Sequence, residues 1–214
     1  MGNRDRLLYF FDPLCGWCWG FSDVMQAFVR NHPELLFQPV CGGMMTGYRE
    51  GPVGSFSKHI LEAIPRLENL TGARFGTTFK DKILSGDMYF SSVKPSLALC
   101  VLRNHFPAQI PGYIHTLMSL HFTEGYSLQE DDVYRILAEE ANMPPETLAL
   151  EMESEEVKYQ FRQDTDFTAN CGIDGFPCMV VQLQDKMYML NQGYNSLESL
   201  ENALTWAKNE AGIG

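Results

Sequence analysis

The sequence predicts an α/β fold that is interrupted by a large all-helical insertion. Short apolar runs typical of buried strands occur near the two ends of the chain. These runs cover residues 7–11, 35–40, 179–183 and 186–190. Between about residues 55 and 171, by contrast, every periodic segment has the spacing of a helix. This order predicts one strand-containing unit that a helical block splits into two parts.

The first part of the chain is predicted to form a strand, a helix and a second strand. Leu7–Phe11 is an unbroken apolar run, and apolar residues at helical spacing follow it. We expect this helix to end before Pro33, because the residue that precedes a proline rarely stays helical. Leu35–Val40 then forms the second strand, and Pro39 indicates that this strand ends there or lies at a sheet edge.

Apolar stripes in the middle of the chain predict a series of helices. The first contains Ile60, Ile64 and Leu67 and is expected to bend at Pro65. The other predicted helices cover residues 96–106, 113–121 and 133–141, a short segment from residue 144, and 155 to about 170.

The last part of the chain is predicted to form a hairpin and a final helix. Two apolar runs, Met179–Leu183 and Lys186–Leu190, are separated by a two-residue turn. The final helix is expected to be capped by Asn195 or Ser196. The predicted organisation is therefore a split unit with an inserted helical domain, with boundaries at residues 1–54, 55–154 and 155–214.

Composition and charge exclude several classes of protein. A hydrophobic share of 45% with 12% aromatic residues supplies a globular core. The net charge of −11 argues against nucleic acid or an anionic membrane as partner, because both need clustered Lys and Arg. No run approaches the ~18 apolar residues of a membrane span, and the apolar run after Arg6 is too short for a secretory signal. We therefore predict a cytoplasmic protein.

Two of the six cysteines have the spacing and position of a redox-active pair. Cys15-Gly16-Trp17-Cys18 lies where the first strand passes into the first helix, with Cys15 at or just before the helix N-terminus. Unpaired backbone N–H groups and the positive end of the helix dipole favour a thiolate there. A dithiol so placed can attack a disulfide through its first sulfur and resolve the mixed disulfide with its second.

A zinc half-site is the main alternative for this pair. A closed zinc site needs four ligands, and the sequence has neither a second C-x-x-C nor an H-x-x-x-H motif. We therefore favour redox chemistry and expect no metal. No bound cofactor is needed either, because the cysteine pair itself holds the electrons. The other cysteines are predicted to be free thiols in a reducing compartment: Cys41, Cys100, Cys171 and Cys178.

Two blocks far apart in the sequence give the chain a family resemblance. One is Asp12–Cys18, and the other is Ala169–Pro177, which leads into the strand at Met179. With these blocks in this order, the chain resembles the DsbA-like family of thiol–disulfide oxidoreductases over essentially its whole length. Within it, the chain is similar to members without an export signal that are described as disulfide isomerases. The resemblance implies a thioredoxin-like fold with a helical insertion.

The resemblance also implies roles for individual residues. Cys15 is expected to be the nucleophile and Cys18 the resolving thiol. Pro177 takes the place of a cis-proline that faces the active-site cysteines. The Phe176 backbone is then free to pair with an extended substrate chain, in the manner of strand addition.

Further candidates surround the cysteine pair. Gly16 and Trp17 are predicted to belong to the substrate-binding surface, with Trp17 exposed. The pair Gly16-Trp17 includes neither a proline nor a histidine, so it leaves the direction of electron flow open. The run Gly42-Gly43-Met44-Met45 either lines the same groove or forms a structural turn, and Gly43 and Met44 are its candidates for substrate binding. Asp12 either relays a proton to Cys18 or repels the Cys15 thiolate, or it is a turn residue before a proline.

The leading hypothesis is a thiol–disulfide oxidoreductase that reduces or isomerises disulfides of proteins or peptides. One alternative is a glutathione-dependent isomerase or transferase on the same fold, which makes glutathione a second candidate partner. Such relatives usually carry a single Ser or Cys where this chain has a complete pair. The other alternative is a non-catalytic peptide-binding or chaperone module, whose main activity would survive Cys15→Ser.

Overall fold

The computed structural model describes residues 5–213 and contains a four-stranded mixed sheet of order β2-β1-β5-β6. The central strand β1 is parallel to β2 and antiparallel to β5, and β5 pairs antiparallel with β6. The strands are β1 (Arg6–Phe11), β2 (Leu36–Cys41), β5 (Cys178–Leu183) and β6 (Lys186–Gln192). The predicted thioredoxin-like order is confirmed, and Pro39 does lie in an edge strand. Residues 1–4 and 214 of the predicted units lie outside the described residues.

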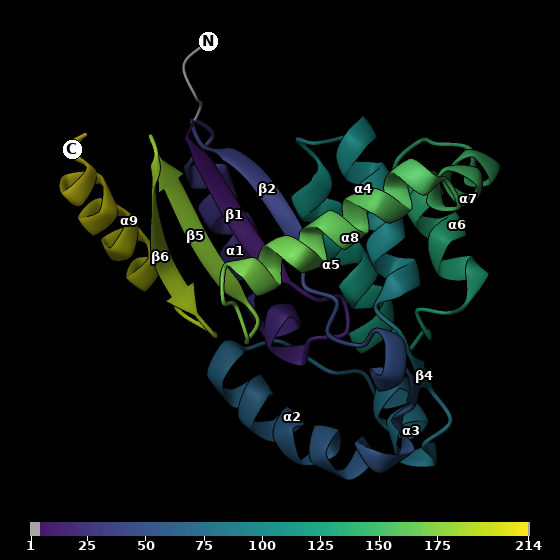
Figure 1. The fold of residues 1–214 in the computed structure, drawn as a ribbon. Helices are drawn as coiled ribbons and strands as arrows, with labels where there is room; N and C mark the ends of the chain where they lie inside the picture. Colours follow the sequence, from purple (N-terminus) through teal and green to yellow (C-terminus); the bar gives the residue numbers. More distant parts are fainter. Residues whose placement is uncertain (1–4, 214) are drawn as a thin grey trace.

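The two faces of the sheet are covered by different helices. Side chains alternate along β1, so Leu7, Tyr9 and Phe11 join the main core while Leu8 and Phe10 join a smaller cluster on the opposite face. Figure 1 shows α8 crossing one face of the sheet, with α1 behind the other face. The helices of this unit are α1 (Gly16–Asn31), α8 (Glu155–Asn170) and α9 (Leu197–Ala211).

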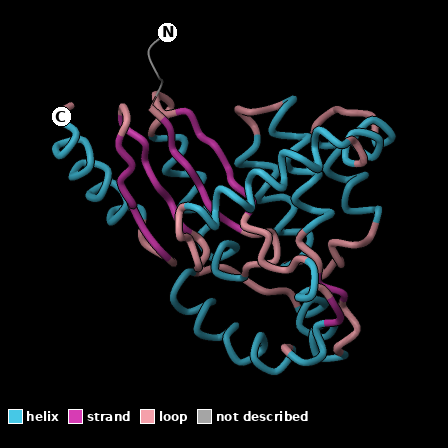
Figure 2. Tube along the Cα trace, in the orientation of Figure 1, coloured by secondary structure: helices cyan, strands magenta, loops and turns pink. Residues whose placement is uncertain are grey.

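The remaining helices form the predicted insertion between β2 and α8. Figure 2 shows most of them to one side of the sheet, with α2 below the end of the strands. They are α2 (Ser57–Thr71), α3 (Thr77–Ser85), α4 (Val93–His105), α5 (Ile110–Phe122), α6 (Asp131–Glu140) and α7 (Pro145–Met152). The sequence did not predict α3 or the small sheet of β3 (Gly51–Pro52) and β4 (Tyr89–Phe90). The boundaries at residues 54/55 and 154/155 stay a prediction.

Local capping explains where several helices begin and end. The Ser154 side chain accepts the Val157 N–H at the start of α8, and Ser196 accepts the Ser199 N–H at the start of α9. The α9 cap is thus the second of the two predicted residues. Helix α2 continues through Pro65 and ends at Gly72, which has a φ of +77°.

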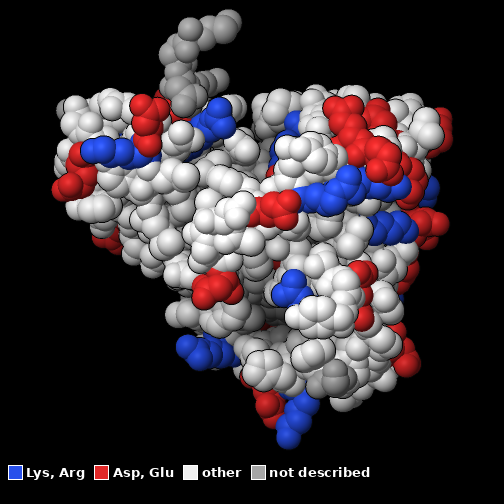
Figure 3. Space-filling view, in the orientation of Figure 1, with Lys and Arg blue, Asp and Glu red and all other residues white. Residues whose placement is uncertain are grey.

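The surface of the visible face is mixed in charge. Acidic and basic side chains are interspersed there, and the face is hollowed between the α2 region and the rest of the molecule (Figure 3). Within residues 5–213, no helix is both long enough and apolar enough to cross a membrane.

Candidate active site

Cys15 is the N-cap of α1, at the point where the chain leaves the sheet. Its backbone is extended (φ −84°, ψ 109°), and its sulfur accepts the Cys18 N–H at 3.3 Å. The Cys15 N–H in turn donates to the Asp12 carbonyl at 3.0 Å, which closes the turn between β1 and α1. An orphan N–H of the first helical turn therefore points at the Cys15 sulfur, as the sequence predicted.

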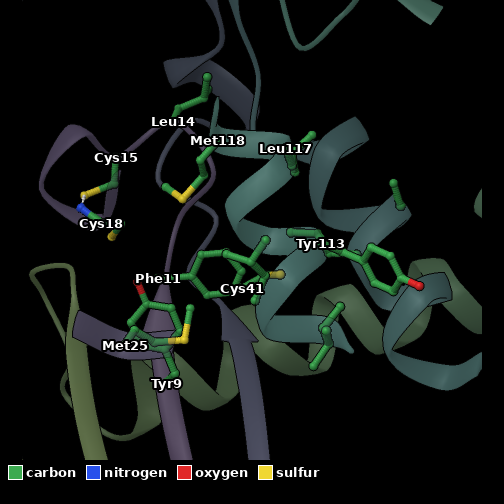
Figure 4. Packing of buried hydrophobic residues seen from close by; sticks show 14 of the residues in the cluster. Tyr9, Phe11, Leu14, Cys15, Cys18, Met25, Cys41, Tyr113, Leu117 and Met118 are labelled. Atoms are coloured by element: carbon green, nitrogen blue, oxygen red, sulfur yellow. Dashed lines mark hydrogen bonds between the residues drawn. The ribbon is translucent and has the colours of Figure 1, made fainter. Parts of the chain in front are cut away.

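Cys18 lies one turn further along α1 and is deeper in the core. It is 0% exposed, whereas Cys15 is 6% exposed. Burial, followed by the neighbouring Cys15, raises the pKa of the Cys18 thiol well above its usual value. Figure 4 shows the two sulfurs side by side at the end of the buried cluster. The two cysteines thus differ in access and in their tendency to ionise.

The Phe176–Pro177 peptide bond is cis and lies beside Cys15. The Cys15 thiol donates to the Phe176 carbonyl at 3.6 Å. On the other side of this loop, the Gly193 N–H donates to the Pro177 carbonyl at 2.7 Å and ties it to the end of β6. The structure therefore brings the two predicted sequence blocks together at the sulfurs.

The loop after β2 contacts Phe176 through Gly42, the first residue of the predicted run. A Cβ added at Gly42 would lie 2.0 Å from the Phe176 ring. Gly42 thus lets the ring pack directly on the backbone. Gly43 has a φ of +64° and Met44 is half-buried against the core. Their predicted role in substrate binding stays a prediction.

Asp12 is fully buried and serves as the anchor of this loop. Its carboxylate accepts the Leu14 N–H at 3.0 Å, the Met44 N–H at 2.7 Å and the Ser92 hydroxyl at 2.8 Å. Burial raises the pKa of Asp12, although these donors act in the opposite direction. Three donors on one carboxylate fit the turn-residue alternative, and the proton relay stays a prediction.

Trp17 is half-buried, so the expectation of an exposed side chain was wrong. The Arg66 guanidinium of α2 lies 5.9 Å from the centroid of its ring. Next to it, a Cβ at Gly16 would meet Leu67 and Phe75 at 3.4 and 3.6 Å. The insertion therefore covers the start of α1, which the sequence did not indicate.

A second cluster of thiols lies where β2 meets the insertion. The sulfurs of Cys41 and Cys100 and a carboxylate oxygen of Asp164 all lie within 4.8 Å of one another. The Arg103 guanidinium already occupies this cluster, donating to Asp164 at 2.9 and 3.2 Å and to the Cys100 sulfur at 3.6 Å. A guanidinium satisfies these acceptors as a metal ion would. No motif could have revealed the cluster, because its members are far apart in the sequence.

Cys178 lies on the other face of the sheet from the cysteine pair. It lies in the smaller cluster on the opposite face of the sheet, near Ile173 and Phe10. Burial raises its pKa to about 11. A cavity of about 840 Å³ is also remote from the cysteine pair, since its wall is formed by insertion residues such as Leu97, Tyr134 and Met152.

Comparison with known proteins identifies the family to which the sequence belongs. The sequence profile of the DSBA-like thioredoxin domain matches residues 6–205. No curated protein sequence matches the chain.

Solved structures match nearly the whole chain. A Nitrosomonas europaea protein, provisionally described as a protein disulfide isomerase, superposes with a TM-score of 0.83 at 20% identity, over 97% of this chain and 99% of that one. The cytosolic disulfide reductase DsbM from Pseudomonas aeruginosa gives a TM-score of 0.77 at 22% identity, over 98% and 100%. A 2-hydroxychromene-2-carboxylate isomerase gives 0.65 at 15%, over 97% and 98%. At these identities the likeness shows the fold.

Proposed function

Because the chain belongs to the family of DsbA-like thioredoxin domains, we propose that it is a thiol–disulfide oxidoreductase that reduces or isomerises protein disulfides through Cys15 and Cys18. One observation carries this proposal. The Cys15 sulfur sits on the N-terminus of α1, 3.3 Å from the Cys18 N–H and 3.6 Å from the Phe176 carbonyl. A nucleophilic sulfur, its resolving partner and a backbone acceptor for a substrate therefore share one site.

In the first step, the Cys15 thiolate attacks one sulfur of a substrate disulfide. A bond forms between Cys15 and that sulfur, the substrate S–S bond breaks, and the departing substrate thiolate takes a proton from water. The N–H groups at the helix start stabilise the negative charge on Cys15 before attack. The raised pKa of Cys18 keeps the second thiol protonated meanwhile, so the two sulfurs act in sequence.

In the second step, Cys18 loses its proton and attacks the Cys15 sulfur of the mixed disulfide. The Cys15–Cys18 bond forms and the bond to the substrate breaks, so that two electrons have passed from the protein to the substrate. If a second substrate thiol attacks the mixed disulfide first, the result is isomerisation. The same two cysteines therefore support both reactions.

The Phe176 carbonyl supplies a way to hold the substrate chain. In the dithiol form it accepts from the Cys15 thiol. Once Cys15 is in a mixed disulfide it has no S–H, so this carbonyl becomes available to an N–H of an extended substrate. The half-buried Trp17 ring, two residues after Cys15 in the sequence, offers an apolar contact to the substrate.

A small thiol is needed to restore the dithiol, and glutathione is our candidate. One structure of DsbM contains GSH, and that chain superposes on this one with a TM-score of 0.73 at 24% identity, over 96% of this chain and 98% of that one. We place the reaction in the cytosol, as for DsbM. A reducing compartment keeps the pair as a dithiol and favours reduction over net oxidation.

The likeness to 2-hydroxychromene-2-carboxylate isomerase favours one alternative, a glutathione-dependent isomerase or transferase. That chemistry requires no second protein thiol. Saturable glutathione binding without any turnover of the Cys15–Cys18 pair would support this alternative.

Insulin reduction in the presence of dithiothreitol tests the proposal. We expect the native chain to accelerate precipitation of the insulin B chain, because the Cys15 thiolate opens the interchain disulfides. Cys15→Ser should abolish the acceleration. Cys18→Ser should instead accumulate a mixed disulfide, visible by mass spectrometry, because the resolving thiol is missing.

Cys100→Ser is a suitable control, since it removes a buried thiol outside the site. It should leave insulin reduction unchanged. Acceleration that persists in Cys15→Ser, or the absence of a trapped species in Cys18→Ser, would contradict the proposed roles.

A further inference from the structure

Tyr9 places a phenolic hydroxyl in the core beside the cysteine pair. It lies in the middle of β1, on the face that packs against α1, and its side chain is completely buried. Its ring stacks on Phe11 with a centroid distance of 5.0 Å and an interplanar angle of 5°, and it also packs against Phe21 and Phe37. These rings hold the hydroxyl in one direction.

The Tyr9 hydroxyl points toward Cys18 in Figure 4. Among the described residues this hydroxyl makes no hydrogen bond. Burial, followed by the neighbouring Cys18 and Cys15 sulfurs, raises the pKa of Tyr9 well above its usual value. The sulfurs are therefore the groups that this hydroxyl meets.

A buried hydroxyl without a strong partner is unfavourable, and Phe would fill the same space without that penalty. The neighbouring residues on this face of β1, Leu7 and Phe11, are apolar. Packing alone therefore does not explain a tyrosine at this position. A neighbouring group that gains negative charge during the reaction would explain it, because the hydroxyl could then donate a hydrogen bond to that group.

Asp12 is the other polar side chain near Cys18, but its carboxylate already accepts three hydrogen bonds. It is also negative, so its charge disfavours a thiolate on Cys18. A neutral hydroxyl that donates a hydrogen bond to Cys18 would favour the thiolate instead.

We propose that the Tyr9 hydroxyl donates a hydrogen bond to the Cys18 sulfur when that sulfur is a thiolate, and so speeds the resolving step. The inference rests on the proposed function of the cysteine pair and adds a donor to one of its reacting atoms. A disulfide sulfur is a weaker hydrogen-bond acceptor than a thiolate. The hydrogen bond from Tyr9 is therefore strongest when Cys18 is a thiolate.

In this step Tyr9 keeps its proton. Cys18 loses its proton to water, and the resulting thiolate attacks the Cys15 sulfur of the mixed disulfide. The Cys15–Cys18 bond forms, the substrate sulfur leaves with the electron pair, and it takes up a proton from water. In the reverse direction Cys18 is the leaving thiolate, and the same hydrogen bond stabilises it.

The two steps can be timed separately with 5,5′-dithiobis(2-nitrobenzoate) and stopped flow. Attack by Cys15 releases the first nitrothiobenzoate, and attack by Cys18 on the mixed disulfide releases the second. A Cys171→Ser background is used, because Cys171 is the least buried of the remaining cysteines. In Tyr9→Phe we expect the second phase to be slower by about tenfold or more, as for loss of a hydrogen bond to a charged group.

The pH dependence of the second phase separates this role from a structural one. In Tyr9→Phe the pH at which the second phase reaches half of its maximal rate should rise. The rate of the first phase should stay within about twofold of the parent rate. Tyr113→Phe is the matched control. Tyr113 is also buried, but its hydroxyl points away from the cysteine pair in Figure 4, so neither phase should change.

An unchanged second phase in Tyr9→Phe, with an unchanged pH dependence, would overturn the inference. Equal slowing of both phases together with a lower unfolding temperature would also overturn it, because the hydroxyl would then only support the core. If the parent chain shows no second phase at all, the proposed function itself fails.

Discussion

Cys15 and Cys18 are one helical turn apart, and their different surroundings give them different chemistry. Cys15 caps α1 and accepts an N–H on its sulfur, while Cys18 is sealed in the core with a raised pKa. The position of the pair at the start of α1 could be predicted because the motif is contiguous and follows an apolar strand. The contribution of Tyr9 could not, because it depends on which face of β1 meets α1.

His121 should make the stability of the protein depend on pH. Its Nδ1 lies 2.8 Å from the Tyr126 carbonyl and donates to it, and its ring packs among Phe79, Phe90 and Phe122. Burial lowers its pKa from 6.5 to about 4. The unfolded chain therefore binds a proton between these two pH values while the folded chain does not, so stability falls as the pH drops through this window.

We expect this effect to reach about 2 kcal/mol by pH 5. Urea unfolding at pH 7 and pH 5 measures it in the native chain and in His121→Gln, where the acid-induced loss should shrink by about that amount. His59→Gln is the control, since His59 is exposed. An equal loss in His121→Gln and the native chain would show that other groups dominate the acid response.

At the scale of elements, the loop after β2 supports the Phe176–Pro177 loop through the contact between Gly42 and the Phe176 ring. A methyl group at Gly42 would lie 2.0 Å from that ring, so the ring or the loop must move. We expect Gly42→Ala to destabilise the fold by about 1–3 kcal/mol. Insulin reduction should fall at least severalfold, because the Phe176 carbonyl shifts relative to Cys15.

Gly51→Ala provides the comparison, because no atom lies within 4 Å of the added Cβ. It should keep the native activity and stability. Native activity in Gly42→Ala would mean that the position of the Phe176 ring is irrelevant to the reaction.

The helices with broad apolar stripes were predictable. The predicted start of α8 at residue 155 agrees with its Ser154 cap, and Ser196, one of the two predicted residues, caps α9. Strands β3 and β4 were not predictable, because two residues have no periodicity. Helix α3 buries only Phe79 and Ile83, which is too short a stripe to stand out. Contacts between distant elements, such as Gly42 with Phe176, leave no local signal either.

At the scale of the whole molecule, the sheet brings two distant blocks together and the insertion closes over them. β1 delivers the cysteine pair at its C-terminal end, and its neighbour β5 begins directly after Pro177. The two blocks come together because β1 and β5 are neighbours in the sheet. The order of the strands along the sequence therefore predicted that Pro177 lies near the cysteine pair. The insertion then covers Trp17 and Gly16 through α2 and the segment after it, a packing that depends on tertiary contacts alone.

The most direct test of the account is a redox titration of the native chain in glutathione buffers, quenched with acid, alkylated after unfolding and mapped by mass spectrometry. We expect Cys15 and Cys18 to be protected together as one disulfide, in a single two-electron transition between about −270 and −120 mV. The other four cysteines should remain alkylated throughout. Independent glutathione adducts on Cys15 and Cys18, with no bond between them at any potential, would contradict the account.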